Sequence, residues 1–215
     1  MGNNNIKEHE KLLSLLEEKA EQEFKKYQKK INPAHQWDHV KRVTKIADMI
    51  LCYEKKANQL EVKIAAILHD IGRHYDNEGD HSYWSAEKAQ EILNQKDIGQ
   101  YIKSLKIDID HIIKIIKNHS KPPEQLSNDL KNDLELMILT DADKIDSFGA
   151  LGILRAPLDE RYQKSYKDQV DHIKDKANPE KYILQTNGGM EIGKRYKDYL
   201  TDFLKEYFFQ INQFK

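Results

Sequence analysis

The sequence predicts an all-α fold built as a helical bundle, and three observations support this prediction. Apolar residues recur with a helical period along most of the 215-residue chain. We find no segment that alternates apolar and polar residues in the manner of a β-strand. Charged residues make up 33% of the chain, but 35 basic and 36 acidic residues leave a net charge of only −1. Such a balance is typical of the solvated faces of amphipathic helices and argues against a disordered chain.

The first half of the chain is predicted to contain three helices before a polar loop. A charged helix covers residues 6–30, and Pro33 interrupts the chain after it. A second helix begins near Asp38. Its apolar side carries Val40, Val43, Ile46, Ala47 and Ile50. A third helix, short and strongly apolar, spans residues 59–71 and is followed by Gly72, a residue type common just after a helix end.

The remaining predicted helices alternate with polar or irregular segments. Residues 85–94 form a helix after the polar loop RHYDNEGDHS, and residues 108–120 form another, which ends at the two prolines of SKPPE. A long apolar helix covers residues 128–148. Residues 155–188 are the least regular part of the chain and finish with the sequence NGG, which predicts a break. An amphipathic helix then spans residues 190–209.

Composition narrows the classes of protein to which the chain can belong. Its near-neutral charge argues against a general nucleic-acid-binding protein, which normally carries a basic excess. The single cysteine, Cys52, has no partner for an internal disulfide, which is typical of a reducing compartment. No stretch approaches the roughly 18 consecutive apolar residues of a membrane-spanning helix, and MGNNNIKEHE lacks an apolar signal core. We therefore expect a cytoplasmic protein without membrane or nucleic-acid partners.

The segment AAILHDIG, residues 65–72, places a histidine and an aspartate at the end of an apolar run. His69 and His39 each lie on the apolar face of their predicted helix, and Asp143 does so in a third helix. Together with Asp70 they form a set of ionisable groups directed to the interior. Burial of such a group without a partner costs on the order of several kcal/mol. A shared divalent cation would remove this cost, because imidazole and carboxylate groups are ligands of Mn, Fe, Co, Ni and Zn.

Each member of this set has an ordinary structural explanation when it is taken alone. A single buried histidine is more often hydrogen-bonded than metal-bound, and an isolated HD dipeptide carries little information. The metal-site prediction rests on the ordered combination of a histidine, then a His-Asp pair, then an aspartate, each on an inward helix face.

Three motifs, HQWDHVKRV, AAILHDIG and LTDADKIDSFGALGILR, resemble successive motifs of the HD-domain metal-dependent phosphohydrolase superfamily. The segment NGGMEIGKRYKDYLTDFLKEY is similar to the last helix of its small bacterial stand-alone members, some of which hydrolyse nucleotides. The resemblance implies one HD-domain-like helical bundle over residues 1–215, with a metal site between its helices. Within it we expect an N-terminal helix (1–30), a metal-binding core (35–150) and a C-terminal helical extension (151–215).

The resemblance also implies a metal centre with one divalent ion of Mn, Fe, Co, Ni or Mg. The four expected ligands are His39, His69, Asp70 and Asp143. In the DADK motif Asp143 is the expected ligand because the family's ligand usually precedes the basic residue, whereas Asp141 is expected to support a neighbouring group or cap a helix. Asp146 is expected to hold a ligand or a helix end. A second ion would involve His81 and His119.

Further residues are candidates for catalysis and substrate binding. The expected catalytic residues are Asp70, His74 and His81. The expected substrate-binding residues are Arg42, Arg73, His119, Lys144 and Arg195. His35 is expected at the rim of the pocket. Each of the cationic residues has the alternative explanation of a surface ion pair, and the histidines can bind phosphate without a second ion.

The implied activity is the metal-dependent hydrolysis of a small phosphorylated metabolite, with a nucleotide as the favoured substrate. Pyrophosphate release from a nucleoside triphosphate and phosphate removal by a nucleotidase both stay open. Lys144 stands where the family has arginine, and the loop RHYDNEG departs from the family pattern, so substrate identity is the least constrained expectation. The alternative function is a catalytically silent module that binds metal and nucleotide. The aromatic tail EYFFQINQF can pack on the first helix or on a second copy, so a homodimer is also open.

Overall fold

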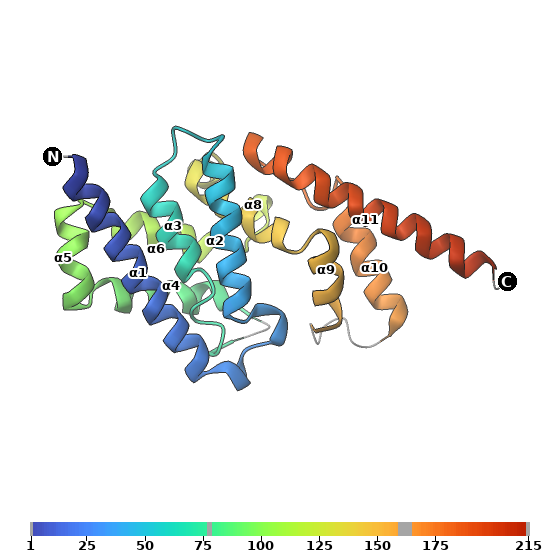
Figure 1. The fold of residues 1–215 in the computed structure, drawn as a ribbon, viewed down its shortest axis with the longest axis horizontal. Coiled ribbons are helices and arrows are strands. Elements are labelled where there is room, and N and C mark those ends of the chain that lie inside the picture. Colours follow the sequence, from blue (N-terminus) through green and yellow to red (C-terminus); the bar gives the residue numbers. More distant parts are fainter. Residues whose placement is uncertain (1, 77–78, 159–164, 214–215) are drawn as a thin grey trace.

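The computed structural model describes residues 2–76, 79–158 and 165–213. Within these ranges the chain forms helices and turns and contains no strand, which confirms the predicted all-α class (Figure 1). The α-helices are α1 (Gly2–Lys26), α2 (Trp37–Leu51), α3 (Gln59–Leu68), α4 (His81–Leu93), α5 (Lys96–Ser104), α6 (Ile109–Asn118), α7 (Asn128–Lys131), α8 (Leu134–Asp146), α9 (Gly149–Arg155), α10 (Tyr166–Ala177) and α11 (Asn187–Gln213). None of these helices combines the length and apolarity needed to cross a membrane.

Helix α2 lies at the centre of the bundle and packs against α8, α3 and α11 (Figure 1). Its predicted apolar side is fully buried at Val40, Val43, Ala47 and Ile50, whereas Ile46 is only partly buried. The helical period of about 3.6 residues places His39 on this same buried side. Because α2 has α8 and α3 as neighbours, residues far apart in the sequence meet at its N-terminal end.

Helices α1, α3, α4, α5 and α6 form one side of the molecule (Figure 1). Helix α1 packs against α3 and α5 through buried Leu12, Leu16 and Ala20, and α4 packs against α6. Helix α6 also contacts α3 and α8. The C-terminal ends of α3 and α6 therefore both approach the α2–α8 pair. The candidate functional site forms where these ends meet α2 and α8.

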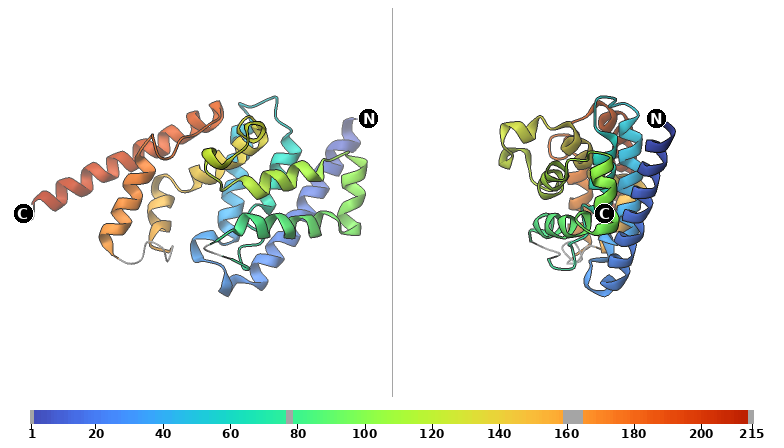
Figure 2. Two further views of the ribbon diagram at one scale, coloured as in Figure 1. Left: turned by 180° about the vertical axis from the view of Figure 1, so that it is seen from behind. Right: turned by 90° about the vertical axis from the view of Figure 1, so that its left-hand side faces the viewer.

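Helices α10 and α11 form the opposite end of the molecule, and the long α11 runs past α2, α8 and α9 (Figures 1 and 2). The aromatic tail lies beside α10, where the Tyr207 ring is 5.8 Å from the Tyr166 ring, and not beside α1. Phe214 at the end of this tail, like residues 77–78 of the loop RHYDNEG, lies outside the described residues.

Two helices were not predicted from the sequence. Helix α10 falls in the segment expected to be irregular, and it begins where the Ser165 hydroxyl accepts a hydrogen bond from the Asp168 amide, at 3.1 Å. Its buried apolar residues are only Val170 and Ile173, and charged residues surround them. The apolar periodicity is therefore too short to indicate a helix. Helix α5 is shorter still, with 9 residues, and buries only Ile98 and Ile102.

Other predicted boundaries also change. The helix expected over residues 128–148 is two helices, α7 and α8, because the Asp133 carboxylate accepts a hydrogen bond from the Leu136 amide and starts a new helix. The helix expected over residues 59–71 ends at Leu68. The NGG sequence is not a break but the first turn of α11.

Gly72 has a role different from the predicted one. Among the described glycines only Gly149 has a positive φ, so Gly72 does not terminate α3 in the left-handed conformation. A Cβ atom at Gly72 would overlap the backbone of Trp84 and Ser85 in α4. The Gly72 amide also donates a hydrogen bond to the Ser85 hydroxyl, at 3.0 Å. The glycine therefore permits the close approach that brings α4, with His81, next to the end of α3.

We expect Gly72→Ala to lower the free energy of unfolding by about 2 kcal/mol, because backbone of α4 must move away from the added methyl group. Urea denaturation followed by circular dichroism measures this change. Gly99→Ala is the matched control. It lies in α5 with open space around its Cα atom, and alanine there should raise stability by about 0.5–1 kcal/mol. Equal stability of the two variants would contradict the packing explanation.

Candidate metal centre

Three buried histidines lie in a row between α2, α3 and α6, with the His69 ring centroid 5.3 Å from that of His39 and 5.2 Å from that of His119. The Nε2 atoms of His39 and His69 are 3.4 Å apart. His69 and His119 each follow the last residue of a helix, and their Nδ1 atoms donate to the carbonyl oxygens of Ala66 and Ile116, at 2.8 and 2.7 Å. A histidine held in this way presents its other nitrogen as a metal ligand. The two helix ends thus fix the orientation of both rings.

The carboxylates of Asp70 and Asp143 complete the cluster. His39 Nε2 lies 3.2 Å from Asp143 Oδ1 and 3.6 Å from Asp70 Oδ2. His69 Nε2 lies 3.7 Å from the same Asp70 oxygen. The candidate ligand atoms of His39, His69 and Asp143 all lie within 4.8 Å of one another. The structure therefore brings together the four residues that the sequence singled out.

Several polar atoms of this cluster are buried without a hydrogen-bond partner among the described residues. They are Asp70 Oδ1, His119 Nε2 and His35 Nδ1. Buried polar atoms are normally paired, so an orphaned group calls for an explanation. One divalent cation among them would satisfy imidazole nitrogens and carboxylate oxygens together. The residues present fit a bound metal ion by this criterion.

The protonation states of most of these groups suit a cation. Burial lowers the pKa of His69 to about 4, so its ring is neutral at pH 7. Burial alone would raise the pKa of Asp70, but the Arg73 guanidinium outweighs it and holds that pKa well below the usual range. In His39 burial is outweighed by the Asp143 and Asp146 carboxylates, so its pKa is raised. A proton and a metal ion would compete for His39 Nε2.

Asp146 orients His39 from outside the cluster. Its Oδ2 atom accepts a hydrogen bond from His39 Nδ1 at 2.7 Å, which leaves Nε2 directed at the centre. The side chain is almost fully buried, and burial, which would raise its pKa, is outweighed by His39 and Arg42, so that the pKa is lowered. A carboxylate on the outer nitrogen of a ligating histidine is a common feature of metal sites.

Two arginines hold Asp146 in place. Arg42 Nε donates to Asp146 Oδ1 at 2.6 Å, and Arg155 Nη1 donates to Asp146 Oδ2. Arg155 was not singled out in the sequence, although it lies within the quoted motif LTDADKIDSFGALGILR. Its spacing from the DADK acids gives no indication of this contact, which depends on the turn between α8 and α9. Arg42, expected to bind substrate, is at least partly committed to this carboxylate.

Further predicted residues surround Asp70. Arg73 Nε donates to Asp70 Oδ2 at 2.5 Å, and His81 Nε2 lies 3.6 Å from Asp70 Oδ1. His119 Nε2 is 3.9 Å from that same oxygen, and His35 Nδ1 is 3.5 Å from Oδ2. His69, Asp70 and His119 form a second group of candidate ligand atoms within 4.8 Å. Asp70 is thus placed between two groups of histidines.

Three predicted residues lie elsewhere. His74 stacks on Tyr27, with ring centroids 3.8 Å apart, and contacts none of the cluster residues in the described part of the chain. Arg195 is exposed on α11 and makes no hydrogen bond or ion pair with a described residue. Lys144 makes no hydrogen bond or ion pair with the described cluster residues, since its Nζ atom donates to the Ile183 carbonyl at 2.9 Å, but it lines the cavity beside the cluster.

A cavity of about 190 Å³ opens beside the cluster. It is lined by Ala34, His35, Asp143, Lys144, Ser147, Arg155, Ala156, His172, Lys176 and Tyr182. Its lining thus includes the candidate ligand Asp143 and the cationic side chains of Lys144, Arg155 and Lys176. Lys176 and Tyr182 come from α10 and the segment after it, which the sequence had left without structure. The cavity therefore adjoins the candidate ligands and is lined by several cationic side chains.

A separate ionic cluster joins α3, α6 and α8. His111 Nδ1 lies 2.7 Å from Glu61 Oε2, and His111 Nε2 lies 3.0 Å from Asp133 Oδ2. Glu135 is nearby, and its Oε1 atom accepts a hydrogen bond from the Asn58 amide. Burial would lower the pKa of His111, but the bonds to Glu61 and Asp133 outweigh it and raise the pKa above 6.5. A protonated His111 between two carboxylates accounts for this cluster without a metal ion.

We expect the stability of the protein to fall as the pH rises through the raised pKa of His111. The folded state holds this proton more tightly than the unfolded state, so the stabilisation is complete below pH 6.5 and is lost as the pH rises through the raised pKa of the folded state. His111→Gln should remove this part of the pH dependence, an effect of up to about 1 kcal/mol. Urea denaturation of both proteins between pH 5.5 and 8.5 measures this effect. If the free energy of unfolding changes with pH in the same way in both proteins, His111 does not stabilise the fold through its ion pairs.

Comparisons with known proteins identify the family of the chain and solved structures that share its fold. A family model described as HD domain matches residues 37–147, just over half of the chain. No curated protein matches the chain. A protein described as a predicted HD superfamily hydrolase, from an uncultured Thermotogales bacterium, is 23% identical, with 94% of this chain and 91% of that chain covered and a TM-score of 0.59.

Two further solved structures share the fold. An HD-superfamily hydrolase from Bacillus thuringiensis is 20% identical over 97% of this chain and 98% of that chain, with a TM-score of 0.59. Bacillus subtilis YpgQ, solved in complex with ADP, is 17% identical over 93% of this chain and 95% of that chain, with a TM-score of 0.57. The family match spans α2 through α8, the helices that carry the four candidate ligands. The chain therefore belongs to the HD domain family.

Proposed function

We propose that this protein is a metal-dependent phosphohydrolase that acts on a small phosphorylated metabolite, with a nucleotide as the favoured substrate. The observation that carries the proposal is the clustering of His39, His69, Asp70 and Asp143, whose imidazole and carboxylate groups make contacts of 3.2 to 3.7 Å, next to buried Asp70 and His119 atoms without a hydrogen-bond partner among the described residues. The membership of the chain in the HD domain family supports the same activity. The ADP bound to YpgQ supports a nucleotide as the substrate.

The proposed reaction is the attack of water on phosphorus, with cleavage of the bond to the leaving oxygen. A bound divalent ion would supply Lewis acidity, which polarises a phosphoryl oxygen and lowers the pKa of a water molecule. Asp70 is ionised and lies at the centre of the cluster, so it can hold the ion and orient the water. The cations of the adjoining cavity would neutralise charge on the phosphate, which is the main requirement of phosphoryl transfer.

The geometry refines the proposed roles of the other residues. Burial, and after it the Arg73 charge, lower the pKa of His81 to about 4, so the ring is neutral at pH 7 and suits a metal ligand or a proton acceptor better than a general acid. His81 and His119 therefore support a second ion that shares Asp70 with the first. His74 and Arg195 lie away from the centre, and we do not include them in the proposed site. Among the substrate-binding candidates, Arg73 and His119 border Asp70, and Lys144 lines the cavity.

The experiment that tests this function combines metal analysis with an activity screen. Protein purified without chelators is analysed for Mn, Fe, Co, Ni and Mg, and phosphate and pyrophosphate release from nucleoside mono-, di- and triphosphates is measured with each metal. We expect one or two ions per chain and turnover of at least one nucleotide. Pyrophosphate as product would identify a triphosphate pyrophosphohydrolase, and phosphate a nucleotidase.

A matched pair of variants on α8 accompanies the screen. Asp143→Asn should lose metal and turnover, whereas Asp141→Asn should keep both, because Asp141 faces Gln185 and Thr186 and not the cluster. Bound metal without turnover of any nucleotide would favour the catalytically silent module instead. Protein without any bound metal, at every metal concentration tested, would overturn the proposal.

A further inference from the structure

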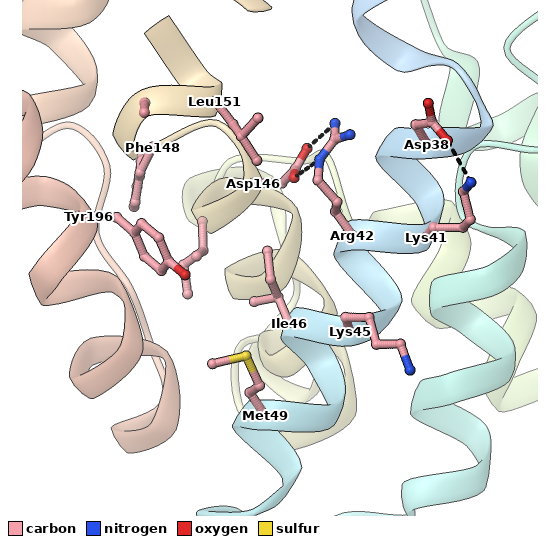
Figure 3. Close-up of a pocket in the computed structure, with 12 residues that line it drawn as sticks. Asp38, Lys41, Arg42, Lys45, Ile46, Met49, Asp146, Phe148, Leu151 and Tyr196 are labelled. Atoms are coloured by element: carbon pink, nitrogen blue, oxygen red, sulfur yellow. Dashed lines mark hydrogen bonds and ion pairs between the residues drawn. The ribbon is translucent and has the colours of Figure 1, made fainter. Parts of the chain in front are cut away.

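A second and larger cavity, of about 560 Å³, lies between α2, α8 and α11 and contains none of the four candidate ligands (Figure 3). Its volume is in the range of about 300–1,000 Å³ that is typical of small-molecule sites. Gly149, with a φ of 66°, allows the Tyr196 ring to approach the turn that forms one wall. Met49 and Leu151 are 46% and 51% exposed there, which is high for large apolar side chains.

The cavity separates apolar from cationic side chains. Ile46, Met49, Phe148, Leu151 and Tyr196 gather at one end, while Lys41, Arg42 and Lys45 lie on one face of α2 toward the other end (Figure 3). Each acidic residue that lines the cavity forms an ion pair with a cationic one: Asp38 pairs with Lys41 at 2.6 Å, and Asp146 pairs with Arg42. Lys45 has no hydrogen bond or ion pair with any described residue. The unbalanced charge at this end is therefore positive.

This arrangement fits an amphiphile with a single anionic head better than a nucleotide. A purine or pyrimidine base needs donors and acceptors to be recognised, and the apolar end offers only the Tyr196 hydroxyl among its side chains. An aliphatic chain needs apolar walls alone. Its carboxylate would meet Arg42 and Lys45 at the cationic end, where charge-assisted hydrogen bonds can form.

The cavity is connected to the metal centre through one carboxylate. Arg42 lines the cavity and donates two hydrogen bonds to Asp146, at 2.6 and 3.1 Å, and Asp146 accepts one from His39. An anion that binds the Arg42 guanidinium competes with Asp146 for it. Asp146 would then orient His39 less firmly, and a metal ion at His39 would be bound more weakly. By linkage the metal ion would weaken binding of the anion by the same factor.

We propose that this cavity is a regulatory site for a fatty-acid-like monoanion, and that its occupation weakens metal binding at the centre next to it. The metal part of the proposal rests on the proposed function, whereas the binding part does not. The two parts are measured separately for this reason.

The binding test uses the full chain and decanoate as the probe, measured by its displacement of the fluorescent dye 8-anilinonaphthalene-1-sulfonate. We expect decanoate to displace the dye, while decan-1-ol, which lacks the charge, and ADP, which lacks the apolar body, do so at least about tenfold less effectively. Leu151→Glu should abolish displacement, and Leu154→Glu should not, although both residues are exposed on α9. Lys45→Glu should weaken it, with Lys11→Glu on α1 as control.

The regulatory test is the affinity for Mn²⁺, measured by calorimetry with and without saturating decanoate. We expect about fivefold weaker Mn²⁺ binding with decanoate in the wild-type protein and no change in Leu151→Glu. Equal dye displacement in Leu151→Glu and Leu154→Glu would overturn the assignment of the cavity. Decanoate binding that leaves the Mn²⁺ affinity unchanged would overturn the regulatory role. A protein that binds decanoate but none of the ions Mn, Fe, Co, Ni and Mg would refute the proposed function and the regulatory role while retaining the binding site.

Discussion

Replacement of Asp70 by asparagine is expected to lower Mn²⁺ affinity by at least about 100-fold and turnover by about three orders of magnitude. Asp70 lies within 4 Å of nitrogen atoms of His35, His39, His69, His81 and His119. No other carboxylate in the described residues has such a position. An amide keeps the shape of the side chain but removes the charge that a divalent cation requires. Calorimetry with Mn²⁺ and the phosphate-release assay measure both effects.

A matched control separates this loss from a general disturbance of α3. Glu61→Gln neutralises a buried carboxylate in the first turn of α3, whereas Asp70 lies two residues after the end of α3, and Glu61 pairs with His111 outside the candidate centre. It should leave Mn²⁺ affinity and turnover unchanged. Because Asp70 also pairs with Arg73, Asp70→Asn is expected to lose about 3 kcal/mol of stability, so circular dichroism must show that the variant is folded at the assay temperature. Normal metal binding by folded Asp70→Asn would refute the assignment of the centre.

The second large effect is expected from Asp141→Ala, which should lower the free energy of unfolding by about 3 kcal/mol. The carboxylate of Asp141 accepts hydrogen bonds from the Gln185 and Thr186 amides, at 2.9 and 2.8 Å, and from the Thr186 hydroxyl at 2.8 Å. These donors lie just before α11, and Thr186 is buried. Alanine would leave them without an acceptor, so the start of α11 would lose its attachment to α8. Urea denaturation measures the change.

Asp141→Asn is the control for this prediction, because an amide oxygen can still accept from Thr186. We expect it to lose less than half as much stability as Asp141→Ala. Metal affinity should stay at the wild-type value in both variants, since Asp141 contacts none of the candidate ligands in the described structure. A stable Asp141→Ala protein that fails to bind Mn²⁺ would show that Asp141, and not Asp143, belongs to the centre.

Much of the fold could be predicted from the sequence because the helices that carry the site have strong helical periodicity. The buried side of α2 and the apolar α3 follow directly from the spacing of their aliphatic residues. Helices α5 and α10 were not predicted, because each buries only a few apolar residues among many charged ones. The start of α8 was missed because the cap at Asp133 lies inside an otherwise continuous helical pattern.

The grouping of His39, His69, Asp70 and Asp143 was also predictable, since inward-facing ionisable residues need partners and can find them only in one another or in a metal ion. The sequence did not indicate which cations would meet those carboxylates. Arg42 was expected at the substrate, but the packing of α2 on α8 places it against Asp146. His74 follows the HD pair closely, yet the turn after α3 directs its ring onto Tyr27 of the chain after α1.

The sequence by itself determined the all-α class, the positions of the main helices and the set of candidate metal ligands. These three properties depend on local periodicity and on the cost of burying single charges, and both can be inferred from the order of residues alone. Only the tertiary structure decided that Asp146 orients His39, that Arg42 and Arg155 share this carboxylate, and that a separate amphipathic cavity lies beside it. Such contacts join residues more than 100 positions apart, or across a turn, and their geometry depends on how the helices pack.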